Sequence, residues 1–154
     1  MAEPTFDLQT AHKYFATDCF NRAWDEIDKT GRSPEDDERM LLLGYASFWH
    51  WSQRGDLNPT SLSVGSWQLA RIHALLNQAP LAIYWAQQSL KYSQSEGVGP
   101  FYRAYAYEAL ARAEKVAGNL PGMQKNLNLA QKWADQVEDL ESRKMIQDDL
   151  GGLA

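Results

Sequence analysis

Two arginines, Arg71 and Arg112, stand out as candidates for ligand binding. Trp67 lies four positions before Arg71, and Glu108 lies four positions before Arg112. On a helix, side chains four positions apart lie on one face, so Arg71 would share a face with Trp67, and Arg112 with Glu108. Guanidinium groups beside aromatic rings suit carboxylate or phosphate ligands. These residues therefore predict a site for an acidic group.

His50 is a second candidate, because it lies between two tryptophans and one helical turn from Ser47 and Arg54. Histidine titrates near neutrality, so a general base is one interpretation. A hydrogen-bonded packing histidine is the other, since buried polar groups take hydrogen-bond partners.

Motifs for metal or phosphate chemistry do not occur in the sequence. Neither His12 nor His73 has a histidine or carboxylate four positions away, as a zinc-binding helix requires. No nucleophile elbow or Walker loop is present. Cys19 is the single cysteine, so an intrachain disulfide is impossible and a cysteine-based metal cluster lacks ligands. We therefore expect no metal and no cofactor.

The composition predicts an all-α protein. Ala occurs 19 times and Leu 18 times, against four Val, four Ile and five Thr, and unbranched residues favour helices over sheets. Hydrophobic residues make up 44% and charged residues 23%, which is typical of globular domains. The first residues lack a signal-peptide pattern, and no apolar run is long enough to span a membrane. We therefore expect a cytoplasmic protein without a membrane partner.

The charge is unevenly distributed along the chain. The net charge is −5, yet residues 59–134 carry +4, while residues 1–58 carry −5 and residues 135–154 carry −4. The negative total argues against a nucleic-acid partner. The basic middle could steer an acidic ligand, or meet the acidic ends of another copy in a homo-oligomer. Solvated acidic helix faces are the alternative explanation.

Apolar residues recur at three- and four-residue steps, which predicts helices separated by proline and glycine breaks. The predicted ranges are 8–29, 34–54, 61–77, 80–94, 101–117, 120–137 and 140–150. Short loops make consecutive helices antiparallel neighbours. We expect one domain over residues 1–154, built from three antiparallel helical hairpins and a short C-terminal capping helix.

The third and fourth predicted helices repeat in the fifth and sixth. A shift of 41 residues aligns Pro59 with Pro100, Leu69-Ala70-Arg71 with Leu110-Ala111-Arg112, Pro80 with Pro121 and Lys91 with Lys132. The spacing of a tetratricopeptide repeat is kept by Tyr107, Leu110, Ala111, Glu114, Met123 and Leu127. The sequence therefore resembles the tetratricopeptide-repeat superfamily, although alanine replaces the family's glycine and the period is 41 instead of about 34. Residues 20–24, 47–51 and 105–112 also resemble an uncharacterised family of bacterial proteins, which supplies no function.

The resemblance implies a right-handed array in which the first helix of each pair lines a concave surface. The groove it implies contains Trp67, Arg71, Glu108 and Arg112. Tyr105 shares a helix face with Glu108 and Arg112 and is a further binding candidate. In the alternative interpretation, Glu108 and Arg112 form an ordinary pair within one helix and Arg71 reaches solvent. Either way, we expect these charges to be exposed and to contribute little to stability.

The sequence supports three functional hypotheses. The first is a non-enzymatic helical-repeat module that binds a peptide or partner protein, with an acidic group, on its concave face. The second is a small-molecule enzyme or sensor with a closed pocket around His50, Arg71, Glu108 and Arg112. The third is a structural homo-oligomer. An open trough at the arginines would favour a peptide, whereas a cavity of roughly 300 to 1,000 Å³ would favour a small ligand.

Overall fold

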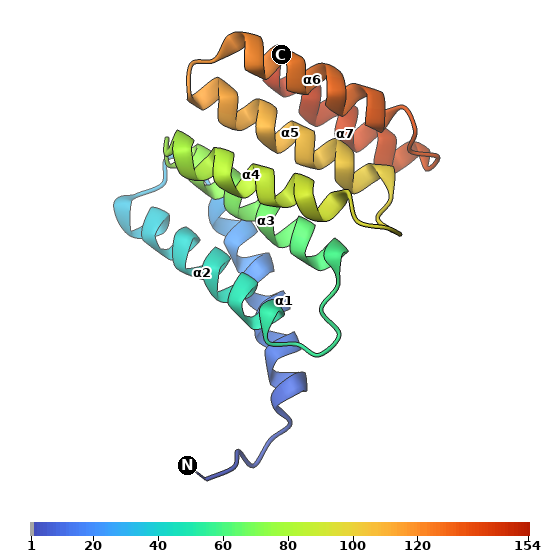
Figure 1. Ribbon diagram of the computed structural model, residues 1–154. Coiled ribbons are helices and arrows are strands. Elements are labelled where there is room, and N and C mark those ends of the chain that lie inside the picture. The colour runs from blue at the N-terminus through green and yellow to red at the C-terminus, as the bar shows by residue number, and fades with distance from the viewer. Residues whose placement is uncertain (1) are drawn as a thin grey trace.

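The computed structural model describes residues 2–154, and every regular element in that range is an α-helix (Figure 1). The all-α prediction is confirmed. The helices are α1 (Leu8–Ile27), α2 (Pro34–Ser52), α3 (Pro59–Leu75), α4 (Ala79–Ser93), α5 (Pro100–Val116), α6 (Leu120–Ala134) and α7 (Leu140–Leu153). Each corresponds to a predicted helix, with ends within three residues of the expected positions.

Local sequence signals account for where the helices begin. The Ser33 side chain accepts a hydrogen bond from the backbone N–H of Asp36, whose carboxylate accepts one from the backbone of Ser33. α3 begins at Pro59, two residues earlier than predicted, because the Asn58 side chain caps that turn. Proline suits the first position of a helix, because a backbone N–H at that position would have no acceptor within the helix.

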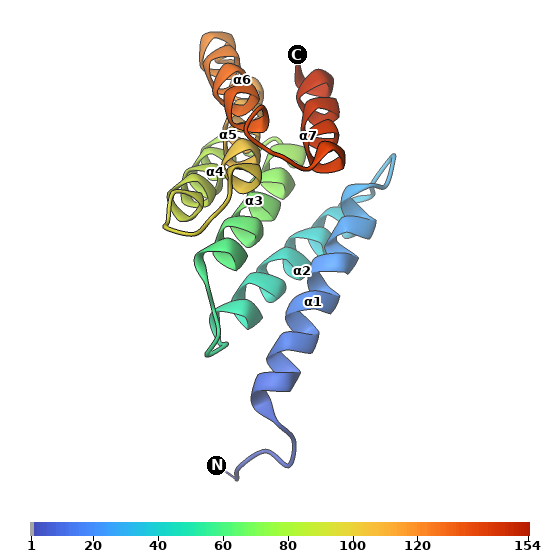
Figure 2. The same cartoon turned by 90° about the vertical axis from the view of Figure 1, so that its right-hand side faces the viewer.

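The helices pack chiefly against their neighbours in the chain. The most extensive contacts join α1 to α2, α3 to α4 and α5 to α6. α3 also contacts α2 and α5, and α7 packs on α5 and α6. In the view of Figure 2, α1 and α7 lie on the same side of α3. This arrangement leaves one side of α3 and α5 facing α1 and α7.

Two glycines let α2 and α3 approach closely. A Cβ atom at Gly44 would lie 2.6 Å from Cδ1 of Ile72, and one at Gly65 would lie 2.8 Å from Cδ2 of Phe48. Both distances are shorter than van der Waals contact, so a side chain at either position would displace the Ile72 or Phe48 side chain that now packs against the glycine.

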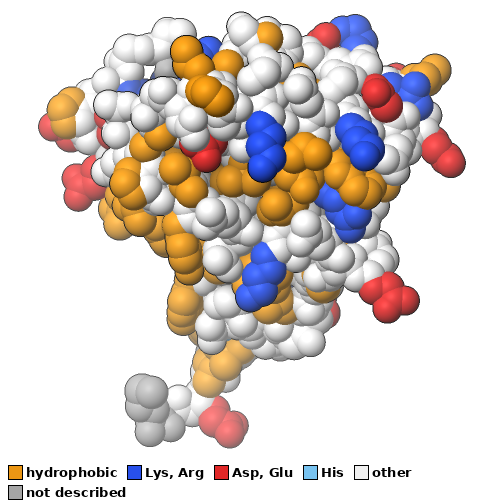
Figure 3. Space-filling model, turned by 45° about the horizontal axis from the view of Figure 1, so that its top comes forward, with side chains coloured by type: hydrophobic (Ala, Val, Ile, Leu, Met, Phe, Trp, Pro, Cys, Tyr) orange, Lys and Arg blue, Asp and Glu red, His pale blue; other side chains and the backbone are white. Residues whose placement is uncertain are grey.

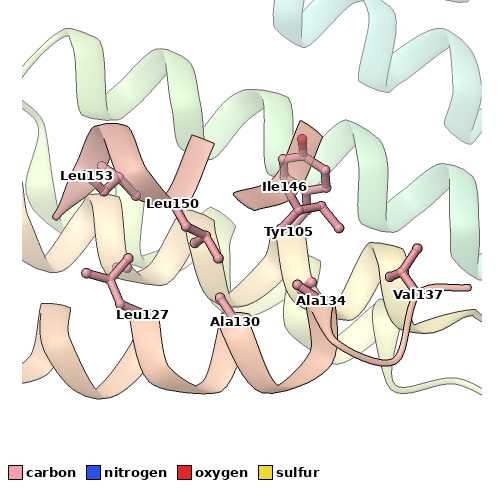
Figure 4. Packing of buried hydrophobic residues seen from close by; sticks show 10 residues of the cluster. Tyr105, Leu127, Ala130, Ala134, Val137, Ile146, Leu150 and Leu153 are labelled. Atoms are coloured by element: carbon pink, nitrogen blue, oxygen red, sulfur yellow. The ribbon is translucent and has the colours of Figure 1, made fainter. Parts of the chain in front are cut away.

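The C-terminal helices share a tightly packed core (Figure 4). Figure 4 shows Leu127 and Ala130 of α6 facing Leu150 and Leu153 of α7. Leu153 is 3% exposed, and α7 continues three residues beyond its predicted end to reach it. Burial of this leucine outweighs the weak helix propensity of the two glycines that precede it.

A chain of hydrogen bonds connects α2, α3 and α4 through the buried side chain of His73. Gln78 Oε1 is an acceptor, so His73 Nδ1 donates to it at 2.6 Å. Nε2 of the neutral ring then accepts from the hydroxyl of Tyr45 at 2.8 Å, and Trp85 Nε1 donates to that hydroxyl at 3.0 Å. Burial lowers the pKa of His73, which favours this neutral form.

Leu110→Asp should destabilise the protein severely, whereas Lys91→Ala should be nearly neutral. Leu110 is buried among Ala70, Ala86 and Ala109, where a carboxylate would have no partner, and Lys91 is exposed. We expect a loss of roughly 3 kcal/mol or more for the first change and under about 0.5 kcal/mol for the second. Urea unfolding followed by circular dichroism measures both. Equal midpoints would contradict the burial of Leu110.

The free energy of unfolding should fall as the pH is lowered through the ordinary pKa of histidine. The folded-state pKa of His73 is lowered, so below about pH 6.5 the unfolded chain binds a proton that the folded chain does not. The decrease is limited to about 1.4 kcal/mol per pH unit. Urea unfolding between pH 8 and pH 5 measures it, and His73→Gln should flatten the profile. An unchanged profile in that variant would exclude His73 as the source.

Candidate functional site

The carboxylate of Glu108 lies at the junction of α5 and α3. It is 1% exposed, and its Oε2 accepts a hydrogen bond from Trp67 Nε1 at 3.1 Å. Its Oε1 accepts from Arg112 Nε at 3.0 Å and also from Arg112 Nη2, while Nη1 of Arg71 lies 3.5 Å away. A buried carboxylate is costly unless it is paired and hydrogen-bonded. Donors from two helices meet that requirement and bring these four side chains together.

Arg71 has hydrogen-bonding capacity that this carboxylate does not use. Its contact with Glu108 is long, and its buried Nε has no hydrogen-bond partner within residues 2–154. Burial, followed by the nearby charge of Arg112, lowers the pKa of Arg71. The charges of Glu108, Asp149 and Asp28 act in the opposite direction. Nε itself is buried, whereas the Arg71 side chain as a whole is 23% exposed, so a ligand would meet the terminal nitrogens of the guanidinium.

A row of aromatic rings crosses α1, α3 and α5. Ring centroids are 5.3 Å apart between Trp24 and Trp67, 5.1 Å between Trp67 and Tyr105, and 5.1 Å between Tyr105 and Phe101. Phe20 extends the row beyond Trp24. These tilted and edge-to-face arrangements are the favourable ones for aromatic pairs. The row therefore forms a preorganised apolar surface across three helices.

Tyr105 also connects this surface to α7. Its hydroxyl donates to Asp149 Oδ2 at 2.7 Å. Burial, and then the hydrogen bond to Asp149, raise the pKa of Tyr105. The Tyr105 hydroxyl therefore stays protonated and donates its hydrogen bond to Asp149 of α7.

The aromatic row borders an apolar cavity of about 260 Å³ that is partly open to solvent. Its aromatic walls are Phe20, Trp24, Trp67, Phe101, Tyr102 and Tyr105. The remaining wall residues are Ser63, Val64, Ser89 and Met145. Each of the two serine hydroxyls donates to the backbone carbonyl of the other residue, at 3.0 and 2.9 Å. Because both serine hydroxyls already have acceptors, they do not require a polar ligand atom, and the cavity suits an apolar ligand.

The structure places His50 among a different set of side chains. Its ring contacts are with His12, Phe15 and Trp49, on α1 and α2. Its Nδ1 lies 2.9 Å from Nδ1 of His12. None of these residues bonds to Glu108 or lines the apolar cavity.

Sequence reasoning selected Trp67 and Tyr105 but missed the contributions of α1 and α7 to the cavity. Phe20 and Trp24 come from α1, and Met145, which is 50% exposed, comes from α7. The 41-residue repeat covers neither helix, so it gave no register for them. The spacing of Phe20 and Trp24, four positions apart, was the available signal.

Apolar side chains also reach the surface outside the cavity. In the view of Figure 3 they form a column along one edge and a second group in the middle, with Lys and Arg side chains beside the second. Leu42 of α2 is 64% exposed and Trp49 is 55% exposed. None of the helices within residues 2–154 combines the length and the apolar character needed to cross a bilayer.

Comparison of this chain with protein-family models, with curated proteins and with solved structures found no match. Its function is therefore argued from its own geometry.

The prediction that these charges are exposed is wrong for Glu108, because the carboxylate that pairs with both arginines is buried. Their contribution to stability stays a prediction, and the burial of Glu108 raises the contribution that we expect. The two arginines also differ. Arg112 makes two hydrogen bonds to Glu108, whereas Arg71 makes one long contact.

Arg112→Ala should therefore destabilise the protein by about 3 kcal/mol, since breaking a buried pair leaves the carboxylate short of donors. Arg71→Ala should cost about 1 kcal/mol or less, because Arg112 and Trp67 still satisfy Glu108. Urea unfolding of the two variants measures the difference. If the costs were equal, or their order reversed, the assignment of Arg112 as the main partner would fail.

Proposed function

We propose that this chain is a tetratricopeptide-like helical-repeat module that binds a peptide or a partner protein. The observation that carries the proposal is the apolar cavity, which takes one of its ten wall residues, Ser89, from α4 and the other nine from α1, α3, α5 and α7. In a right-handed array of three helical hairpins closed by a C-terminal helix, these are the helices that line the concave surface. Repeat arrays use such surfaces for binding.

The size of the cavity supports a single side chain as its occupant. Small-molecule sites usually enclose about 300 to 1,000 Å³, whereas an apolar cavity of about 150 Å³ holds one benzene ring. At about 260 Å³ the cavity matches one aromatic or branched aliphatic side chain. A peptide that inserts such a residue gains roughly 1.5 to 3 kcal/mol from its burial.

Arg71 supports an acidic group next to that apolar residue. It lies one helical turn from Trp67, whose ring forms part of the cavity wall. The terminal nitrogens of its guanidinium are suited to a carboxylate, and a partly exposed guanidinium can pair without complete desolvation. We therefore propose a ligand with an apolar side chain followed or preceded by an acidic one.

The cytoplasmic location and the lack of a nucleic-acid partner stay predictions.

A small-molecule site built from His50 together with the Glu108 cluster receives no comparable support. His50 has its contacts with residues of α1 and α2 that do not take part in the cluster. Among the cavity wall residues, the two serine hydroxyls are engaged with the backbone and the hydroxyl of Tyr105 donates to Asp149.

Fluorescently labelled short peptides, each with one central Phe, Leu or Ser flanked by Asp or by Lys, test the proposal by fluorescence anisotropy. Phe and Leu peptides should bind at least about tenfold more tightly than Ser peptides. Val64→Trp should remove this preference, because Val64 lines the cavity and the larger ring would fill it. Arg71→Ala should keep the preference for Phe and lose the preference for Asp over Lys.

Leu120→Trp is the matched control, since Leu120 is 60% exposed and lies outside the cavity wall. It adds the same ring and should bind like the wild type. If Val64→Trp does not fold, Met145→Asp places a charge at the exposed rim instead. Equal binding of all peptides, or wild-type binding by the cavity variants, would refute the proposal.

A further inference from the structure

His12 of α1 and His50 of α2 face one another across the first helix pair. Their Nδ1 atoms are 2.9 Å apart, and their ring centroids are 5.1 Å apart at an interplanar angle of 50°. Both side chains are half-buried, so solvent reaches them. Neither residue belongs to the aromatic cavity, and the pair is independent of the proposed peptide site.

The separation of the two nitrogens is the one that a chelated metal ion requires. Imidazole nitrogens bind first-row metals at about 2.0 to 2.1 Å. Two of them in adjacent positions of a square or octahedral ion are then about 2.9 Å apart, whereas tetrahedral ligands are about 3.3 Å apart. The observed 2.9 Å matches the first geometry. In the hydrogen bond the two Nδ1 atoms face one another, so each ring must turn by roughly 45° to aim its lone pair at one ion, and the broad second torsion of a histidine permits such a turn.

The protonation state of the pair is compatible with metal binding. A hydrogen bond between two Nδ1 atoms needs one ring to donate and the other to accept. A metal ion that bonds to both Nδ1 atoms displaces the shared proton, which moves to solvent or to Nε2 of the same ring.

We propose that His12 and His50 form a chelating site for a divalent cation of tetragonal preference, with Cu²⁺ bound most tightly and Ni²⁺ next. Imidazole suits both ions, and affinity for a given site rises from Ni²⁺ to Cu²⁺. No group of three or more histidine, cysteine or carboxylate side chains suited to a metal occurs within residues 2–154. Water therefore fills the remaining positions, and the ion exchanges with solvent.

Trp49 gives the site a specific optical signal. Its ring centroid lies 4.9 Å from that of His50 and 5.6 Å from that of His12. A paramagnetic Cu²⁺ ion at the two nitrogens lies close enough to quench the fluorescence of this tryptophan. Because the ion bridges α1 and α2, its binding also stabilises the folded chain by mass action.

The test titrates the full chain with CuCl₂, NiCl₂ or ZnCl₂ in a non-coordinating buffer, and measures calorimetric affinity, tryptophan fluorescence and melting temperature. Cys19→Ser serves as the common background, because it removes the single thiol as a competing ligand. We expect one Cu²⁺ per chain, weaker Ni²⁺ and Zn²⁺ binding, and a melting temperature raised by about 3 °C or more in excess Cu²⁺.

His12→Ala and His50→Ala should each weaken Cu²⁺ binding at least tenfold, because one imidazole no longer benefits from the second. His73→Gln is the matched control, since His73 is buried against Tyr45 and Gln78, and it should bind Cu²⁺ like the background protein. Trp49→Phe should retain the affinity and lose the quenching. If an alanine variant does not fold, the asparagine variant replaces it. Cu²⁺ binding that survives loss of either histidine, or no one-site binding at all, would overturn the proposal.

Discussion

The buried carboxylate of Glu108 is the constraint on which the centre of this molecule depends. A carboxylate that is 1% exposed must be supplied with donors, and those donors come from Trp67 and Arg71 on α3 and from Arg112 on its own helix. This requirement fixes the register of α3 against α5. It also fixes the orientation of the Trp67 ring, because the indole nitrogen must point at the carboxylate. The indole nitrogen of Trp67 thus stabilises the buried carboxylate, while the apolar ring lines the cavity.

Alanines and aromatic rings are both present where the central helices pack. Ala70, Ala86 and Ala109 are buried where helices meet, and Gly44 and Gly65 let α2 and α3 approach. The aromatic row that borders the cavity lies across α1, α3 and α5, whereas Trp85 of α4 forms a second aromatic group with Tyr45 and Phe48 of α2.

The first helix pair differs in character from the rest of the chain. It supplies Phe20 and Trp24 to the aromatic row from one side of α1, while His12 and Phe15 of the same helix contact His50 of α2. Its acidic side chains lie outside both groups. α1 therefore contributes to two separate surfaces, and a ligand at one of them need not affect the other.

The sequence by itself determined the helical class and the seven helices, because helix propensity, capping residues and proline positions act within a few residues of each helix end. It also indicated Trp67, Arg71, Glu108 and Arg112 as neighbours, through a repeat that keeps equivalent residues in register. Only the tertiary structure decided that Glu108 is buried and that α1 and α7 complete the cavity. Only the tertiary structure paired His12 with His50 across 38 positions. Burial and contact between distant helices depend on how whole faces pack, and no local pattern encodes which of two faces will be covered.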